Sequence, residues 1–114
     1  MSVKMNDLSN VVTILNSPIL TSFGSYDYRK ISLEEAKIIC RKQIRSAIGH
    51  QSTADILTKL LERDIPLNRI QYKQEMNEIA VVFKLKGRPE EGKILTIQEI
   101  EEIGYEFGVL IRTT

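Results

Sequence analysis

The sequence has 114 residues, of which 42% are hydrophobic and 27% are charged, and its formal net charge is +1. This length and balance predict one soluble globular domain with a modest core, and they exclude a largely disordered chain. The near-neutral charge argues against a long nucleic acid or an anionic membrane surface as partner. A nucleotide partner would be small and locally recognised.

The chain begins with a polar, irregular stretch that is followed by a strand. Residues 1–9 are expected to be a flexible extension, and residues 10–114 a single domain. Residues 11–15 are apolar and rich in β-branched side chains, which predicts a buried strand that ends in the turn Asn16-Ser17-Pro18. Residues 25–31 carry tyrosines at alternate positions and predict a second strand.

Two helices are predicted next. Residues 32–35 have the spacing of a capping box, and apolar residues then follow at intervals of three and four, so the first helix is expected to reach residues 48–49. A second helix is expected to begin with Ser52 as its N-cap and to end at residues 64–66. A turn between these two helices would carry His50.

A hairpin and a charged loop are predicted for the following segment. Residues 69–74 and 78–85 are expected to be its two strands, joined around residues 75–77. Residues 86–93 are densely charged and bracketed by glycines, which predicts an exposed loop.

The last part predicts a third helix and a final strand. The capping-box spacing recurs at residues 96–99 and begins a short helix that ends near Gly104, and residues 107–112 read as a strand. The expected fold class is therefore α/β, with a mixed sheet of about five strands flanked by about three helices. The helices between strands favour parallel pairing, and the hairpin supplies an antiparallel pair.

The single cysteine and single histidine restrict redox and metal chemistry. Cys40 cannot form an internal disulfide and is expected to be a small buried hydrophobe. One cysteine and one histidine cannot build a thiolate or imidazole metal cluster within one chain, and no spacing indicates an all-carboxylate site, so neither metal nor cofactor is expected. No apolar run approaches the ~20 residues that cross a bilayer, and no signal-peptide pattern follows the start. We therefore expect a cytoplasmic protein without a membrane partner.

His50 is the first candidate for chemistry, because histidine can exchange a proton near neutrality. Gly49 before it permits the close approach of a ligand or another backbone, and Ser52 and Thr53 after it can begin a helix. The N–H groups at a helix start suit a phosphate. An ordinary solvent-exposed histidine in a turn is the more common occurrence of this pattern, so it needs partners elsewhere in the chain.

The charged loop and two further positions supply possible partners. Arg88 and Glu91 could form part of a loop that brings an arginine onto a phosphate, or of an ordinary solvated connection. Arg69 is either a phosphate contact or a surface charge. The turn at Asn16 and Ser17 follows a strand, where ligands of open α/β sheets gather, but it could equally be a simple polar turn.

Four motifs occur together in one order along the chain, at residues 15–18, 48–53, 66–69 and 87–96. They read Leu-Asn-Ser-Pro, Ile-Gly-His-Gln-Ser-Thr, Pro-Leu-Asn-Arg and Gly-Arg-Pro-Glu-Glu-Gly-Lys-Ile-Leu-Thr. In these motifs the chain resembles the viral anti-CRISPR ring nucleases, from about Val11 to the C-terminus.

The resemblance implies a homodimer that binds cyclic tetra-adenylate across its interface and cleaves it without a metal, which would switch off type III CRISPR signalling. It implies that His50 is the general acid and that Arg88 and Glu91 are the active-site pair on the covering loop. The substrate-binding positions that it implies are Asn16, Ser17, Gly49, Ser52, Thr53 and Arg69.

The expected reaction uses the ribose 2′-OH as nucleophile and yields linear adenylates that end in a 2′,3′-cyclic phosphate. Glu91 would either accept the 2′-OH proton or position Arg88. Two alternatives remain open at this point. One is a non-catalytic protein that sequesters a cyclic nucleotide, and the other is a protein-interaction module of a mobile element.

Overall fold

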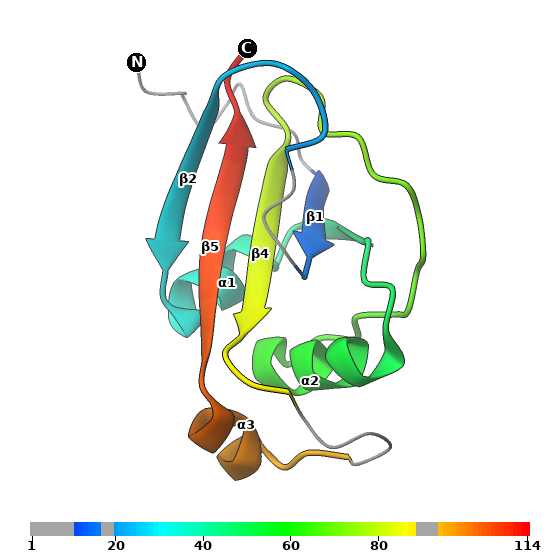
Figure 1. Cartoon of the computed structure of the whole chain (residues 1–114), viewed down its shortest axis with the longest axis vertical. Coiled ribbons are helices and arrows are strands. Elements are labelled where there is room, and N and C mark those ends of the chain that lie inside the picture. Colours follow the sequence, from blue (N-terminus) through cyan, green and yellow to red (C-terminus); the bar gives the residue numbers. More distant parts are fainter. Residues whose placement is uncertain (1–10, 17–19, 89–93) are drawn as a thin grey trace.

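The computed structural model describes residues 11–16, 20–88 and 94–114. Within these ranges the chain forms a sheet of five strands in the order β2-β5-β4-β1-β3, together with three helices (Figure 1). The elements, in chain order, are β1 (Val11–Leu15), β2 (Tyr26–Ile31), α1 (Leu33–Ile39), β3 (Gln43–Ser46), α2 (Gln51–Leu61), β4 (Ile79–Leu85), α3 (Ile97–Ile103) and β5 (Tyr105–Arg112). The α/β class and the mixed sheet predicted from the sequence are confirmed.

Parallel and antiparallel pairing occupy different halves of the sheet. β1 pairs in parallel with both β3 and β4, whereas β5 pairs antiparallel with both β4 and β2. The carboxyl ends of β1, β3 and β4 therefore lie at one edge of the sheet, which we call the carboxyl edge. α2 lies at this edge, as Figure 1 shows.

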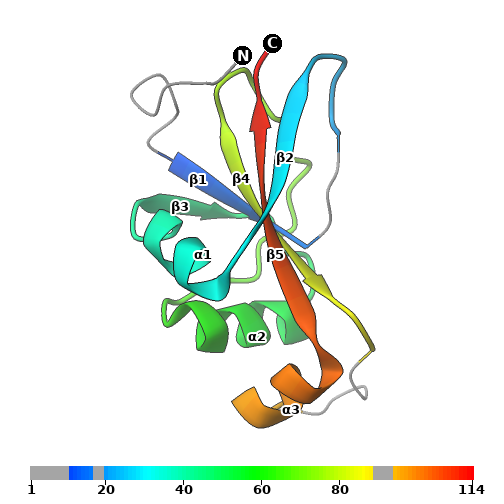
Figure 2. The same cartoon turned by 90° about the vertical axis from the view of Figure 1, so that its left-hand side faces the viewer.

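The main core fills the side of the sheet that the helices cover. Side chains alternate between the faces of a strand, and Val12, Ile14, Val81 and Phe83 point to the helical side. They pack with residues of all three helices, namely Ala36, Leu57 and Ile100. Figure 2 shows α1 and α2 on this side and α3 beyond the lower ends of β4 and β5. The other face carries a smaller apolar cluster of Leu15, Ala80, Val82 and Leu110, with Tyr26 and Tyr72 against it.

Both predicted capping boxes are present. The Ser32 hydroxyl accepts a hydrogen bond from the backbone N–H of Glu35, whose carboxylate accepts one from the N–H of Ser32. Thr96 and Glu99 make the same reciprocal pair at the start of α3, which ends at Gly104 as predicted. Each box satisfies two backbone donors that a helix start leaves unpaired.

The predicted first helix is too long, because residues 43–46 form β3. α1 ends at Ile39, and the carbonyl oxygens of Cys40 and Lys42 accept hydrogen bonds from the guanidinium of Arg63, two residues after the end of α2. A continued helix would need those carbonyls for its own N–H groups. The apolar spacing that predicted a helix through Ile44 also fits a strand with Ile44 on the helical side of the sheet. Cys40 itself is buried, as expected.

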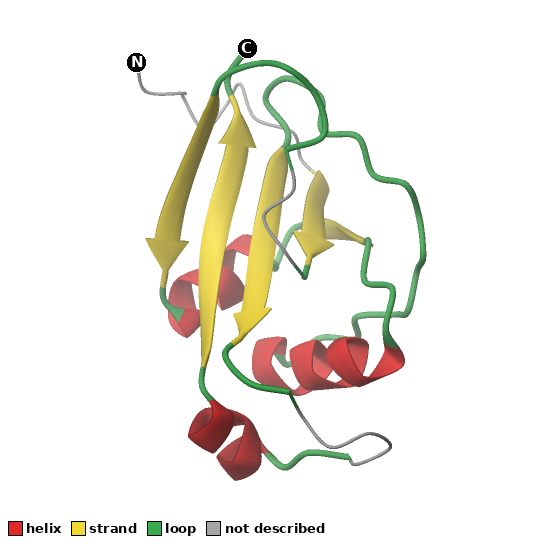
Figure 3. Ribbon diagram, viewed as in Figure 1, coloured by secondary structure: helices red, strands yellow, loops and turns green. Residues whose placement is uncertain are grey.

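The predicted hairpin is also wrong. A turn occurs at residues 75–78, where it was expected, but residues 69–74 form no strand. β4 has β1 on one edge and β5 on the other, so no edge of β4 remains for a third partner. The chain between α2 and β4 is instead a long irregular connection that returns past the β3 side of the sheet (Figure 3).

The predicted extension at residues 1–9 lies outside the described residues. The described helices include none with the length and apolar character needed to cross a membrane.

Candidate functional site

Three parallel strands deliver predicted site residues to the carboxyl edge. β1 ends directly before Asn16, β3 leads through a short turn to Gly49 and His50, and β4 leads to Arg88. β1 lies between the other two, with Ile14 opposite Ser46 on one side and Leu15 opposite Val82 on the other. Neighbouring strands lie about 4.8 Å apart, so these chain ends meet in one region. Ligands of open α/β sheets bind at such an edge.

His50 is the N-cap of α2, which corrects the prediction of Ser52. Its backbone is extended, with φ −129° and ψ 131°, and its carbonyl oxygen accepts the first helical hydrogen bond from Ala54 at 3.1 Å. Ser52 and Thr53 therefore lie in the first turn, because the helix begins as soon as the chain leaves β3. Among the described residues no side-chain hydrogen bond caps this end, and the first turn holds no acidic residue. The unpaired N–H groups and the positive end of the helix dipole are left open to an anion.

Arg69 lies against the residue that precedes His50. Its Nε donates a 2.7 Å hydrogen bond to the carbonyl oxygen of Gly49. A Cβ at Gly49 would lie 3.4 Å from Cγ of Arg69, so the arginine side chain passes closely over the glycine. The two terminal guanidinium nitrogens make no hydrogen bond within the described residues. The positive charge of Arg69, twenty positions after Gly49 in the chain, is thereby held next to the residue that precedes His50.

Hydrogen bonds that the sequence did not predict join the two segments that carry these residues. The hydroxyl of Ser46, the last residue of β3, donates to the carbonyl oxygen of Pro66 at 2.6 Å. Asn68 donates twice, from its backbone N–H to Ile48 and from its side-chain amide to Ser46, both at 2.8 Å. The only signal for Asn68 in the sequence was its place next to Arg69 in the Pro-Leu-Asn-Arg motif.

Most of the predicted site side chains have no hydrogen-bond or ion-pair partner among the described residues. In the described part of the chain, the side chains of five of them make no hydrogen bond or ion pair: Asn16, His50, Ser52, Thr53 and Arg88. Four of the five are exposed, and Thr53 is half-buried. Together with Arg69 they form a polar, positively charged edge that can bind an anion without breaking existing bonds. Among the described residues, no three His, Cys, Asp or Glu side chains are grouped so that they could hold a metal ion.

Arg88 lies further out than the other residues of the site. β4 continues for three residues past Val82, the partner of Leu15, before the loop begins. The first residue of that loop is fixed by a 2.8 Å hydrogen bond from the N–H of Lys86 to Gly104, and Leu95 after the loop is held by the Lys59 ammonium of α2. Within the described residues, no hydrogen bond or ion pair joins Arg88 to the rest of the site. Ser17 and Glu91 lie outside the described residues.

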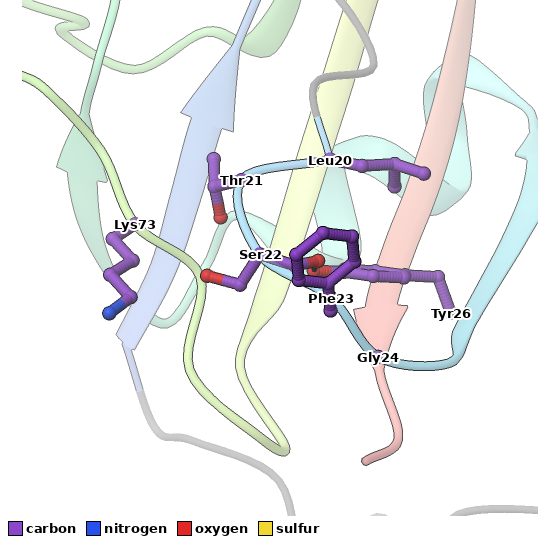
Figure 4. Close-up of a pocket in the computed structure, with 7 residues that line it drawn as sticks. All are labelled: Leu20, Thr21, Ser22, Phe23, Gly24, Tyr26 and Lys73. Atoms are coloured by element: carbon purple, nitrogen blue, oxygen red, sulfur yellow. Dashed lines mark hydrogen bonds between the residues drawn. The ribbon is translucent and has the colours of Figure 1, made fainter.

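A separate pocket lies at the opposite edge of the sheet and contains none of the predicted site residues. It has a volume of about 770 Å³ and is lined by Leu20, Thr21, Ser22, Phe23, Gly24, Tyr26 and Lys73 (Figure 4). The Tyr26 hydroxyl donates to the carbonyl oxygen of Ser22 at 2.8 Å, which fixes the loop across this pocket. Among the described lining residues, Lys73 is the only one whose side chain carries a formal charge.

The sequence is similar to one known family and to proteins from viruses and a bacterium. Residues 12–107 match the family described as STIV B116-like. The chain belongs to this family. It is 38% identical over 98 residues to protein 26 of Sulfolobus islandicus filamentous virus, covering 81% of this chain and 83% of the viral protein. It is 36% identical over 104 residues to the YddF protein of Bacillus subtilis, covering 89% and 96% of the two chains.

The fold is also that of a solved member of the family. The structure of B116 of Sulfolobus turreted icosahedral virus superimposes with a TM-score of 0.76 and covers 90% of this chain and 98% of the viral one. The two sequences are 22% identical, so this likeness establishes the fold alone. The names of these relatives state no activity, and the family is one that viral proteins share.

Proposed function

We propose that this protein is a metal-independent ring nuclease that cleaves cyclic tetra-adenylate and so switches off type III CRISPR signalling. The observation that carries the proposal is the placement of Arg69 against Gly49, next to His50 at the uncapped start of α2. This arrangement brings a cation to the residue before a histidine, at a helix start whose N–H groups are unpaired within the described residues. Metal-free cleavage of a phosphodiester could use all three kinds of group.

Phosphate binding would use groups that are unpaired within the described residues. The first-turn N–H groups of α2 and the terminal guanidinium nitrogens of Arg69 can both donate to phosphate oxygens. The hydroxyls of Ser52 and Thr53 lie in the same turn and add neutral donors. Asn16, which directly follows the adjacent strand β1, would contact a ribose or a base.

The chemical step would follow from RNA's own nucleophile. The ribose 2′-oxygen attacks the adjacent phosphorus and gives its proton to Glu91, or to water if Glu91 only positions Arg88. The bond from phosphorus to the 5′-oxygen breaks, and a 2′,3′-cyclic phosphate remains. Protonated His50 donates its proton to the departing 5′-oxygen. Arg69 and the helix N–H groups stabilise the additional negative charge of the transition state. No redox partner or metal takes part in this balance.

The covering loop and a second copy would complete the site. From the resemblance we assign Arg88 to the transferring phosphate, and Glu91 either to the 2′-OH proton or to positioning Arg88; Ser17 is assigned to substrate binding. A homodimer would place two His50 side chains on a ring ligand of compatible symmetry, so that opposite bonds are cleaved. The exposed position of His50 suits a site that is closed by another chain or by the loop.

The test is cleavage of cyclic tetra-adenylate in EDTA by the wild-type protein and by His50→Ala, with calorimetry of both. Arg29→Ala is the matched control, since Arg29 is an exposed cation on β2 at the far side of the sheet. We expect linear products that end in a 2′,3′-cyclic phosphate, a cleavage rate roughly 100-fold or more lower for His50→Ala, and no change for Arg29→Ala.

Three results would contradict the proposal. Intact ligand recovered from a tight complex with the wild type would identify a sequestering protein instead. The absence of any nucleotide-induced thermal shift would favour an interaction module, because a ligand that binds only the folded state must stabilise it. Cleavage by His50→Ala at the wild-type rate would remove the assigned general acid.

A further inference from the structure

Residues 46–49 and 66–69 lie side by side and carry the two groups on which the proposed function rests. Four hydrogen bonds connect the two segments. Ser46 donates to Pro66, Asn68 donates to both Ile48 and Ser46, and Arg69 donates to Gly49. We propose that Ser46 and Asn68 are positioning residues that hold the Arg69 guanidinium in place beside His50. Neither residue contacts the ligand in this proposal.

Ser46 acts at the point where β3 ends. The residue is 4% exposed, and its hydroxyl both donates to Pro66 and accepts a 3.3 Å hydrogen bond from the N–H of Ile48. One hydroxyl thus fixes the turn that leads to Gly49 and also the start of the opposite segment. Its removal would leave the buried N–H of Ile48 without a partner and the carbonyl oxygen of Pro66 without its donor.

Asn68 acts from the opposite segment. It is the residue before Arg69, and its backbone and side-chain donors reach two carbonyl oxygens of the 46–49 segment. The segments that lead to both functional residues are therefore tied together, because Asn68 directly precedes Arg69 and its partner Ile48 lies two residues before His50. Because a displacement of about 1 Å in a positioned group can lower a rate on the order of 100-fold, these bonds matter for catalysis as well as for folding.

The variants separate positioning from stability. Asn68→Asp keeps the shape and the backbone hydrogen bond but sets a carboxylate oxygen against the Ser46 carbonyl in place of the donor. Ser46→Ala removes the hydroxyl, and Ser46→Thr retains it. Ser32→Ala is the matched control, since it also deletes a hydroxyl that accepts a backbone hydrogen bond, but at the start of α1 beside the opposite edge strand, β2.

The first measurement does not depend on activity. Hydrogen exchange of the Arg69 Nε–H, followed by nitrogen-15 NMR, reports its bond to Gly49. We expect exchange to be roughly tenfold faster in Asn68→Asp and Ser46→Ala, and unchanged in Ser32→Ala and Ser46→Thr. Unchanged exchange in the first two variants would overturn the inference, whatever the protein does to cyclic tetra-adenylate.

The second measurement is the split between kcat and KM for the cyclic tetramer. We expect kcat to fall roughly tenfold or more in Asn68→Asp and Ser46→Ala and to recover in Ser46→Thr. Ser32→Ala should keep the wild-type kcat at a comparable loss of stability, measured by urea unfolding. A kcat that tracks unfolding free energy across all four variants would overturn the positioning role. A wild-type protein that does not cleave the ring would refute the proposed function, while the exchange experiment still decides the inference.

Discussion

Arg69 and Gly49 are joined by a hydrogen bond of 2.7 Å from the guanidinium Nε to the carbonyl oxygen, although they belong to segments on either side of α2. Because only Nε is used, the terminal nitrogens can make a bidentate contact with a phosphate. Because Gly49 has no side chain, the arginine stem can lie over the backbone directly before His50. The bond thus sets both the position and the direction of the cation.

Replacing Arg69 should weaken binding of cyclic tetra-adenylate. Arg69→Ala removes a charged donor pair, so we expect the dissociation constant to rise by roughly 10- to 100-fold. Arg69→Lys keeps the charge but not the bond to Gly49, and should fall between the wild type and Arg69→Ala. Calorimetry at two salt concentrations measures the dissociation constants of the two variants and of the wild type. An alanine variant with unchanged affinity would show that Arg69 does not contact the ligand.

Replacing Arg63 should destabilise the fold without involving the site. Its guanidinium donates to the carbonyl oxygens of Cys40 and Lys42, the two positions between which the chain passes from α1 toward β3. We expect Arg63→Ala to lower the free energy of unfolding by about 1.5–3 kcal/mol. Arg41→Ala, an exposed cation in the same turn, should stay within about 0.5 kcal/mol. Urea denaturation measures the free energy of unfolding of both variants. Equal losses of stability in Arg63→Ala and Arg41→Ala would contradict the role given to Arg63.

Cys40 should make stability depend on pH in the alkaline range. Burial raises the pKa of its thiol from 9.0 to about 11, against a smaller opposite effect of Arg63. The unfolded chain therefore ionises first, and the stabilising contribution that is complete below pH 9 is lost as the pH rises towards 11. At pH 10 the loss should be about 1 kcal/mol.

The measurement is urea unfolding of the wild type and of Cys40→Ala at pH 8 and pH 10. Other groups titrate in this range in both proteins, so the difference between their two pH dependences isolates the thiol. A wild-type protein that loses no more stability than Cys40→Ala would contradict the burial of Cys40.

Gly108 should tolerate no side chain while Tyr28 lies over it. A Cβ at Gly108 would be 2.5 Å from Cε1 and 3.0 Å from the hydroxyl of Tyr28, on the neighbouring strand. We expect Gly108→Ala to cost about 1–3 kcal/mol, because the ring must move. In a Tyr28→Ala background the same change should cost much less, and a double-mutant cycle measures the coupling. Additive effects of the two substitutions would show that the ring is not in contact.

Local signals in the sequence predicted the parts of the fold that depend on neighbouring residues. The capping boxes at Ser32 and Thr96 are examples, since all of their atoms lie within four residues. β3 was missed because the spacing of Cys40 and Ile44 fits a helix as well as a strand. What decides between them is Arg63, about twenty residues away, and the edge of β1; neither is visible in a local pattern.

In the candidate site, too, the sequence predicted local features but not long-range contacts. His50, Gly49 and Arg69 could be singled out from residue type and from the resemblance, but His50 was assigned to a turn between two helices. The structure places it after a strand, so that it shares the carboxyl edge with Asn16. The contributions of Ser46 and Asn68 could not be predicted, since their hydrogen bonds join segments about twenty residues apart.

The pairing of β2 with β5 has a consequence for how the molecule is made. β2 has no other neighbour in the described sheet, and the hydrogen bond that continues this pairing, from Thr113 to Ser25, spans 88 residues. On the ribosome, residues 26–31 must therefore remain an unpaired strand until residues 105–112 have been synthesised. Long-range pairing of this kind slows folding. The partner strand β5 also pairs with β4, so the proposed nuclease would complete its sheet only after these later residues have been made.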